Sequence, residues 1–200
     1  MATQKQSVVT PERFTQGITY DQWMEQIGRN QARFTENYDE MQLSDDDARV
    51  LKELAGREKG PARCLALGED WCPDVFRGLP VMARIAEASG MELRIFFRDQ
   101  NKDIMEEFRK GGEHESIPVF VFYTKDHDYI AHWIERPALA NEQMTELREL
   151  TEPLRDPDIS QEERQKLIKA YIDFQHGPVW DGWRQATVRE VRELLEEHSV

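Results

Sequence analysis

An uninterrupted apolar segment, Val119–Tyr123 (V-F-V-F-Y), constrains the fold more than any other part of this chain. A strand in which every residue is apolar is typical of the centre of a sheet covered on both faces. Upstream, Arg63–Gly68 (R-C-L-A-L-G) and Met91–Arg98 (M-E-L-R-I-F-F-R) predict two further strands, with a helix over Pro73–Ser89 between them. This order predicts a parallel pair of strands joined by a right-handed crossover.

The elements around these three strands complete the predicted core. A short helix is expected over Asn101–Lys110, and the turn at Lys125–Asp128 returns the chain as a hairpin strand over Tyr129–Ile134. A further helix is expected from Pro137 to about Leu150. The resulting order is β-α-β-α-β-β-α, which predicts an α/β fold with a mixed central sheet flanked by helices.

Helices are also expected before the core. Residues 1–17 are expected to be loosely packed. Thr19 is followed three residues later by a glutamine, the spacing of a capping box, and apolar residues then recur at helical spacing. We expect an amphipathic helix over about Tyr20–Tyr38, weakened in its middle by Gly28, where a break would fall, and a second helix beginning after Ser44.

The C-terminal region predicts two more helices from two capping-box patterns. They are expected over Ser160–Phe174 and over Thr187–Glu197. Between them, the segment from His176 to Trp183 is rich in turn-forming residues and includes Trp180. We expect its tryptophans to pack the C-terminal region onto the core rather than to form a binding patch.

These patterns divide the 200 residues into three regions. The expected arrangement is an N-terminal helical extension over residues 1–60, a core over residues 61–150, and a C-terminal helical extension over residues 151–200 that packs on the core. The length suffices for one large hydrophobic core.

The composition excludes several classes of function. The chain has 26 Lys and Arg residues against 39 Asp and Glu, a formal charge of −13. Such a surface repels phosphate backbones, so we expect no nucleic-acid binding. No segment approaches the roughly 20 apolar residues of a membrane span, and Met1–Thr10 has no apolar signal core. We therefore expect a soluble, cytoplasmic protein without a membrane partner.

Cysteine and histidine counts argue against a metal or disulfide framework. The two cysteines, Cys64 and Cys72, are too few for a disulfide scaffold or a cysteine-rich zinc site. The five histidines show no metal-ligand spacing, and the acidic triplet Asp45–Asp47 is explained as the charged start of a helix. We expect neither a metal nor a cofactor.

Cys72 is the residue with the clearest chemical potential, because it lies where the first strand passes into a helix. Unpaired backbone N–H groups and the helix dipole at that junction favour the thiolate, which is the reactive form. The carboxylates of Glu69, Asp70 and Asp74 oppose it. The sequence leaves this competition open.

These residues carry a family resemblance. Trp71-Cys72 at a helix start, Pro80 within that helix, and Ile117-Pro118 before the central strand together resemble the thioredoxin fold. More narrowly, the run E-D-W-C-P-D and the N-terminal helices resemble a bacterial group of thioredoxin-like proteins with helical extensions at both ends. The resemblance implies a cis Ile117–Pro118 bond that faces the cysteine and exposes the Ile117 backbone to an extended partner.

The resemblance also assigns site roles. Cys72 is expected to be the nucleophile, and Trp71, Pro73, Ile117 and Pro118 are expected to contact the substrate. His114, near the proline loop, is expected to be a solvent-facing histidine.

Two departures from the family pattern matter for function. Val75 occupies the position of the resolving cysteine, and Ala66 occupies the position of the buried acid that assists proton transfer. Cys64 lies within a strand, and we expect it to be a buried apolar residue rather than a partner for Cys72. An ordinary dithiol thioredoxin is therefore not expected.

Related single-cysteine families fit only in part. Cys72-Pro73 is similar to the glutaredoxin motif, in which one cysteine serves in glutathione exchange. The Gly-Gly-x-Asp stretch that holds glutathione there has no counterpart, since Trp133–Pro137 stands in its place. Arg98 or Arg136 could hold a carboxylate, but each is expected to be a surface ion-pair partner.

Three functions remain in competition. The first is a single-cysteine thiol–disulfide oxidoreductase that forms a mixed disulfide at Cys72 and is released by an external thiol. Its partners would be protein or small-molecule thiols and disulfides. The alternatives are a redox-inactive binding or scaffold protein that keeps the fold, and a thiol sensor in which Cys72 is oxidised to a sulfenic acid.

Overall fold

The structure is a computed structural model that describes residues 7–199. The chain forms two compact units, one of Met1–Glu135 with Val188–Val200 and the other of Arg136–Thr187. The N-terminal helices thus share a unit with the sheet, and the last residues of the chain return to it. The three regions expected from the sequence therefore do not coincide with the compact units.

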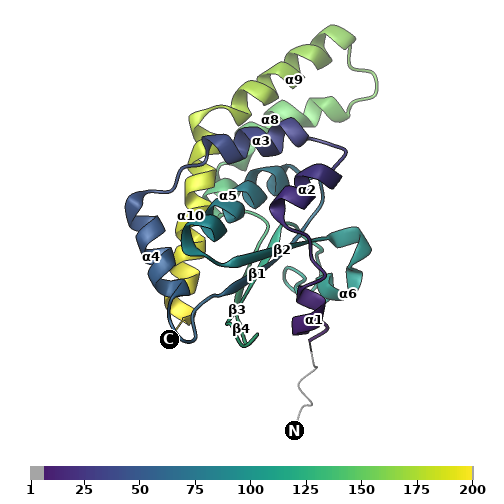
Figure 1. The fold of residues 1–200 in the computed structure, drawn as a ribbon. Coiled ribbons are helices and arrows are strands. Elements are labelled where there is room, and N and C mark those ends of the chain that lie inside the picture. Colours follow the sequence, from purple (N-terminus) through teal and green to yellow (C-terminus); the bar gives the residue numbers. More distant parts are fainter. Residues whose placement is uncertain (1–6, 200) are drawn as a thin grey trace. The chain divides into compact units, whose positions relative to one another are not determined.

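The first unit is built on a mixed four-stranded sheet with the order β2-β1-β3-β4 (Figure 1). The strands are β1 (Arg63–Gly68), β2 (Glu92–Phe97), β3 (Val119–Tyr123) and β4 (Tyr129–Ile134). β1 pairs with β2 in parallel and with β3 antiparallel, and β3 and β4 form an antiparallel hairpin. Every residue of β3 is buried, as expected for a central strand. The predicted α/β fold class is confirmed.

The register of the sheet brings two loops together. Leu67 of β1 lies opposite Val119 of β3, in an antiparallel pair. The residues that follow β1 and the residues that precede β3 are therefore at the same edge of the sheet. This places the loop that leads to Cys72 next to Ile117 and Pro118.

Helix α5 (Pro73–Ser89) connects β1 to β2 and has the bounds predicted from the sequence. Pro73 occupies the first helical turn, where its missing N–H costs no hydrogen bond. Gly90 ends the helix with a φ of 82°, a left-handed conformation that glycine adopts without strain. Pro80 lies inside the helix and, like most of α5, is buried.

Within the described residues, four helices precede the sheet. They are α1 (Pro11–Phe14), α2 (Tyr20–Gln26), α3 (Gln31–Glu40) and α4 (Asp45–Ala55). The Thr19 capping box is present at the start of α2. The single helix expected over Tyr20–Tyr38 breaks near Gly28, because Ile27 is extended and Asn30 is left-handed with a φ of 55°. The expectation of loose packing is wrong for α1, whose Phe14 is fully buried. Residues 1–6 lie outside the described residues.

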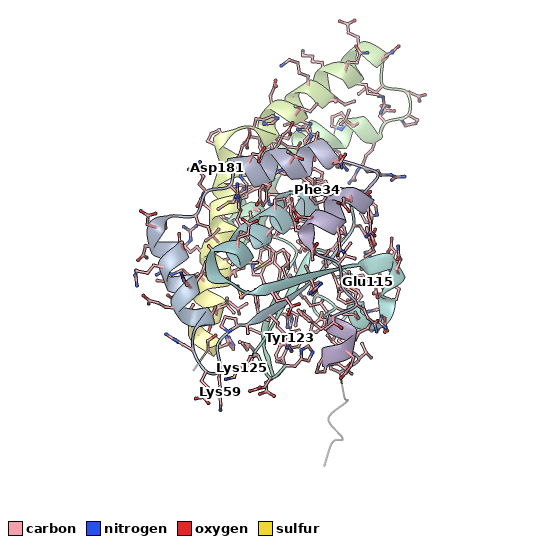
Figure 2. The ribbon with its side chains drawn as sticks, in the orientation of Figure 1. Phe34, Lys59, Glu115, Tyr123, Lys125 and Asp181 are labelled. Atoms are coloured by element: carbon pink, nitrogen blue, oxygen red, sulfur yellow. The ribbon has the colours of Figure 1, made fainter. Side chains whose placement is uncertain are left out.

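Buried aromatic side chains attach the N-terminal helices to the core. Trp23 of α2 is fully buried and stacks on Phe97 at the end of β2, with ring centroids 4.5 Å apart. Phe34 of α3, labelled in Figure 2, is fully buried and meets Phe76 of α5 edge-on. Helices α3 and α4 both pack against α5. These helices are therefore an integral part of the unit.

The segment between β2 and β3 is less helical than predicted. The 3-10 turn η1 (Arg98–Gln100) is followed by the short helix α6 (Lys102–Met105), so the helix expected over Asn101–Lys110 ends early. Gly111 and Gly112 both have positive φ values and reverse the chain.

The second unit is helical. Its elements are α7 (Ala138–Glu142), α8 (Met144–Thr151), η2 (Glu152–Arg155), α9 (Gln161–Gln175) and the first half of α10 (Pro178–His198). The helix predicted from Pro137 is divided at Gln143, and the predicted cap of α9 at Ser160 is confirmed.

The prediction of a turn at His176–Trp183 with a helix start at Thr187 is wrong. Helix α10 begins at Pro178, and the Thr187 hydroxyl donates to the Trp183 carbonyl within it. Trp180 and Trp183 instead pack with Phe174 in the interior of the second unit.

The last turns of α10 belong to the first unit. Arg192 pairs with Asp46 and Asp47 of α4, both at 2.8 Å. Trp133 of β4 donates from its indole nitrogen to Glu190 at 2.8 Å. Between residues 7 and 199, no helix combines the length and apolar character needed to cross a membrane.

Candidate functional site

Cys72 lies at the N-cap position of α5. Its backbone carbonyl accepts hydrogen bonds from the N–H groups of Val75 at 3.0 Å and Phe76 at 3.1 Å, which begin the helix. Its own N–H donates to the carbonyl of Glu69 at 3.3 Å, closing the loop that precedes it. The cysteine is partly exposed, and its thiol is free.

The thiol faces the loop that enters β3. The Ile117–Pro118 peptide bond is cis, as the resemblance implied. The Cys72 Sγ donates to the Ile117 carbonyl oxygen at 3.8 Å, within the range for a weak sulfur hydrogen bond. The structure thus brings together the three residues that the sequence analysis placed at the centre of the site.

A glycine in α5 permits this close approach. A Cβ atom added to Gly78 would lie 3.2 Å from the Pro118 ring and 3.8 Å from the Phe120 ring. The absence of a side chain at Gly78 therefore lets the helix that carries Cys72 pack directly on the cis proline. The local sequence around Gly78 does not predict this role, because nothing in it shows which residues Gly78 would touch.

Trp71 and Pro73 flank the thiol on the surface. The Trp71 side chain is 44% exposed, an unusual degree for a large aromatic residue, and Pro73 is also exposed. The guanidinium of Arg98 lies 5.4 Å from the centre of the Trp71 ring, in a cation–π contact. Ile117 is only 4% exposed, so what it can offer a partner is chiefly its backbone.

The other candidate residues are occupied or lie elsewhere. Arg98 pairs with Asp99 at 2.9 Å and donates to the Glu115 carbonyl at 3.0 Å, as expected of an ion-pair partner. Arg136 begins the second unit, where it donates to the Met144 sulfur. His114 is exposed and forms a backbone bridge with Lys110.

The pKa of the Cys72 thiol is raised above its ordinary value. Burial is the largest cause, and the negative charge of Asp74 adds to it. The N–H groups of Val75 and Asp74 and the charge of Arg77 act in the opposite direction but do not compensate. The balance of these effects therefore favours the neutral thiol over the thiolate.

An ion pair forms at the start of α5, within the first residues that follow Cys72. Arg77 is almost completely buried, at 1% side-chain exposure, and contacts Asp74 at 2.7 Å. Because the two charges have opposite effects on Cys72, their pairing limits how far either one can move the pKa of the thiol.

The second cysteine takes no part in this arrangement. Cys64 is fully buried in β1, between Leu93 and Phe122 of the neighbouring strands, and burial raises its pKa. Val75 and Ala66 are also fully buried and apolar. Apolar side chains therefore occupy both the position of the resolving cysteine and the position of the buried acid.

Two acidic residues have a structural role that sequence reasoning missed. Glu69 accepts a hydrogen bond from the Asp99 N–H at 2.8 Å, and burial raises the pKa of its carboxyl group. Asp70 accepts hydrogen bonds from the backbone of Gly28 and Arg29. The sequence showed these side chains only as charges near the thiol, since their partners are distant in the chain.

Within residues 7–199, no three His, Cys, Asp or Glu side chains are grouped to hold a metal ion. An open groove of about 490 Å³ lies between the α3–α4 linker and α5. It is lined by Met41, Gln42, Leu43, Arg84, Glu87 and Ala88. None of these belongs to the thiol site.

Two features together define a thioredoxin-like protein when the sheet has this strand order. One is a cysteine at the start of the helix that follows β1, and the other is a cis proline that precedes β3 and faces the cysteine. A family model described as "Thioredoxin" matches residues 17–148, which include the helices α2–α4. The chain therefore belongs to this thioredoxin family.

Two solved structures share the fold. A protein of unknown function from Pseudomonas aeruginosa aligns with a TM-score of 0.66 and 15% identity, covering 94% of this chain and 98% of that one. An HIV epitope-scaffold aligns with a TM-score of 0.61 and 18% identity, covering 93% and 96% of the two chains. No curated protein matches the chain.

Proposed function

We propose that this protein is a single-cysteine thiol–disulfide oxidoreductase that acts through a mixed disulfide at Cys72. The observation that carries the proposal is the position of the Cys72 sulfur. Cys72 is partly exposed at a helix start, and its sulfur lies 3.8 Å from the Ile117 carbonyl, beside the cis Pro118. An extended disulfide substrate paired with the Ile117 backbone would present its sulfur to this thiol.

The exchange has two balanced steps. In the first, the Cys72 thiolate attacks one sulfur of a disulfide; the S–S bond breaks, and the other sulfur leaves as a thiolate that takes up a proton. In the second, the thiolate of an external thiol attacks the substrate sulfur of the mixed disulfide. The new disulfide is released, and Cys72 returns as thiolate. Electrons pass between the two partners without a cofactor.

The need for an external thiol follows from Val75. Its buried aliphatic side chain occupies the place where a second cysteine would resolve the mixed disulfide. We assign substrate contact to Trp71, Pro73, Ile117 and Pro118. A cytoplasmic location, with a pool of reduced small thiols, would supply the second partner.

A redox-inactive binding protein is the second candidate, and the raised pKa of the thiol favours it. A neutral thiol is a poor nucleophile, and no buried acid stands at Ala66 to accept its proton. A thiol sensor would need the same thiolate as the oxidoreductase, and the cis-proline loop beside Cys72 supports docking of a disulfide substrate instead. If the protein is an oxidoreductase, its exchange rate should rise steeply with pH.

The test is reduction of a small disulfide by excess reduced glutathione, followed at several pH values. We expect the wild-type protein and Cys64→Ser to accelerate the exchange equally and Cys72→Ser to be inactive. A wild-type protein that gives no acceleration between pH 7 and 9 would refute the oxidoreductase and leave the binding protein. Equal activity of Cys72→Ser and wild type would remove Cys72 from the mechanism.

A further inference from the structure

Asp70 joins the loop that carries the thiol to the N-terminal helices. Its Oδ2 accepts hydrogen bonds from the N–H groups of Gly28 at 3.0 Å and Arg29 at 2.9 Å. Its backbone carbonyl accepts a third hydrogen bond, from the side-chain amide of Asn30 at 2.8 Å. A residue two positions before Cys72 is thus bound by three consecutive residues of the α2–α3 turn.

The α2–α3 turn has the backbone shape that this contact needs. Helix α2 stops because Ile27 is extended, and Asn30 takes a left-handed conformation at the start of α3. Asparagine tolerates this conformation better than most residues. The N–H groups of Gly28 and Arg29, which lie between these two residues, both point at one carboxylate oxygen of Asp70. Backbone amides commonly bind anions in this arrangement.

The turn is held firmly on both sides. Trp23, before it, is buried against Phe97, and Phe34, after it, is buried against Phe76. Movement of the turn would therefore require displacement of at least one large aromatic side chain from the interior. The position of Asp70 is in this way fixed by the packing of α2 and α3.

A second anchor holds the same loop from another direction. The carboxylate of Glu69 accepts the Asp99 N–H of η1 at 2.8 Å. Two neighbouring acidic residues thus tie the loop to two separate elements. The next two residues are the exposed Trp71 and the thiol itself, so both anchors act directly on the geometry of the site.

We infer that Asp70 is a positioning residue through which the α2–α3 turn holds Cys72 opposite Ile117. This inference rests on the proposed thiol exchange and adds the N-terminal helices to its site. With the anchor intact, the sulfur of the partly exposed Cys72 lies beside the Ile117 carbonyl, where a paired substrate would meet it. Without it, the loop gains freedom, so the thiol becomes more accessible to small reagents and less well aligned for a docked disulfide.

The test compares four variants of the full chain. Asp70→Ala removes the two side-chain hydrogen bonds, and Asp70→Asn keeps an oxygen acceptor without the charge. Asn30→Gly removes one hydrogen bond but still allows the left-handed backbone. Asp126→Ala is the control, since Asp126 is an exposed turn residue.

Three measurements are made well below the unfolding temperature of each variant. They are the rate of disulfide exchange, the pH profile of Cys72 alkylation by iodoacetamide, and the hydrogen exchange of the Gly28 and Arg29 amides. For Asp70→Ala we expect exchange to fall about ten-fold, in line with the cost of small misalignments. Its limiting alkylation rate at high pH should rise several-fold, and the two amides should lose protection.

The variants separate positioning from stability. We expect Asp70→Asn to recover most of the exchange rate, Asn30→Gly to be intermediate, and Asp126→Ala to match wild type. A lower unfolding temperature for Asp70→Ala with unchanged exchange and alkylation rates would overturn the inference. If the wild-type protein shows no exchange, the proposed function fails, but the alkylation profile still tests the positioning role of Asp70. An unchanged limiting alkylation rate in Asp70→Ala overturns that role, and a raised rate supports it.

Discussion

The Cys72 sulfur lies 3.8 Å from the Ile117 carbonyl oxygen, although 45 residues separate the two in the chain. The sheet register creates this proximity, because Leu67 opposite Val119 places the end of β1 beside the start of β3. Gly78 then allows α5 to approach Pro118 closely. The site is therefore a product of strand pairing and helix packing, to which each loop contributes only a few residues.

Asp74→Asn should make Cys72 more reactive at neutral pH. The negative charge of Asp74 raises the pKa of the thiol, while Arg77 lowers it, so removal of the carboxylate lowers that pKa. The rate of iodoacetamide alkylation follows the thiolate fraction, and its pH profile should shift to lower pH. Asp126→Asn is the matched control. A profile that is unshifted, or shifted to higher pH, would contradict the assigned electrostatics.

Val75→Cys should convert the protein into a dithiol protein. Positions three apart at a helix start have side chains about 5–6 Å apart, within reach of a disulfide after small adjustments. We expect the oxidised variant to lose two hydrogens by mass spectrometry and to release substrate without an external thiol. Cys72→Ser combined with Val75→Cys is the control. Failure to form the internal bond under oxidising conditions would show that the helix start differs from the one described.

Gly78→Val should destabilise the protein and impair the site. The added side chain would press on the Pro118 ring, which already lies 3.2 Å from a Cβ at this position. Overpacking of this kind costs about 1–3 kcal/mol of unfolding free energy. Gly182→Val, a helical position with nothing within 4 Å of its Cβ, should change stability by less than about 0.5 kcal/mol. Denaturant unfolding of both variants measures the difference, and equal effects would contradict it.

Trp23→Ala should show that the N-terminal helices are required for a stable core. Trp23 is fully buried and stacked on Phe97, so its removal should cost about 3–5 kcal/mol of unfolding free energy. Trp71→Ala removes an exposed ring and should cost less than about 1 kcal/mol while lowering the exchange rate. A loss below about 1 kcal/mol for Trp23→Ala would mean that α2 packs only loosely on the sheet.

The sequence predicts the strands and α5 well because their signals are local. Uninterrupted or alternating apolar runs define the four strands, and Pro73 and Gly90 mark the ends of α5. The start of α10 is predicted wrongly because it depends on packing between residues rather than on local signals. His176–Trp183 contains glycine, proline and aspartate, which are typical of turns, yet burial of Trp180 and Trp183 beside Phe174 stabilises a helix there.

At the candidate site too, the sequence predicts local motifs but not contacts between distant residues. Cys72, Trp71 and Ile117-Pro118 could be recognised because each stands in a short motif next to a predicted element. The contacts of Asp70 with Gly28 and Arg29 span about 40 residues and use backbone N–H groups, which leave no trace in residue type. The raised pKa of the thiol also depends on burial, which no local pattern near Cys72 reveals.

The most direct test of the account is whether Cys72 forms a reversible mixed disulfide in the native protein. The reduced protein is incubated with oxidised glutathione, and the site of any adduct is mapped by mass spectrometry before and after addition of excess thiol. The account predicts one glutathione on Cys72, none on the buried Cys64, faster formation at pH 9 than at pH 7, and full release by the added thiol. An unmodified Cys72 at both pH values, or an adduct found on Cys64 instead, would contradict it.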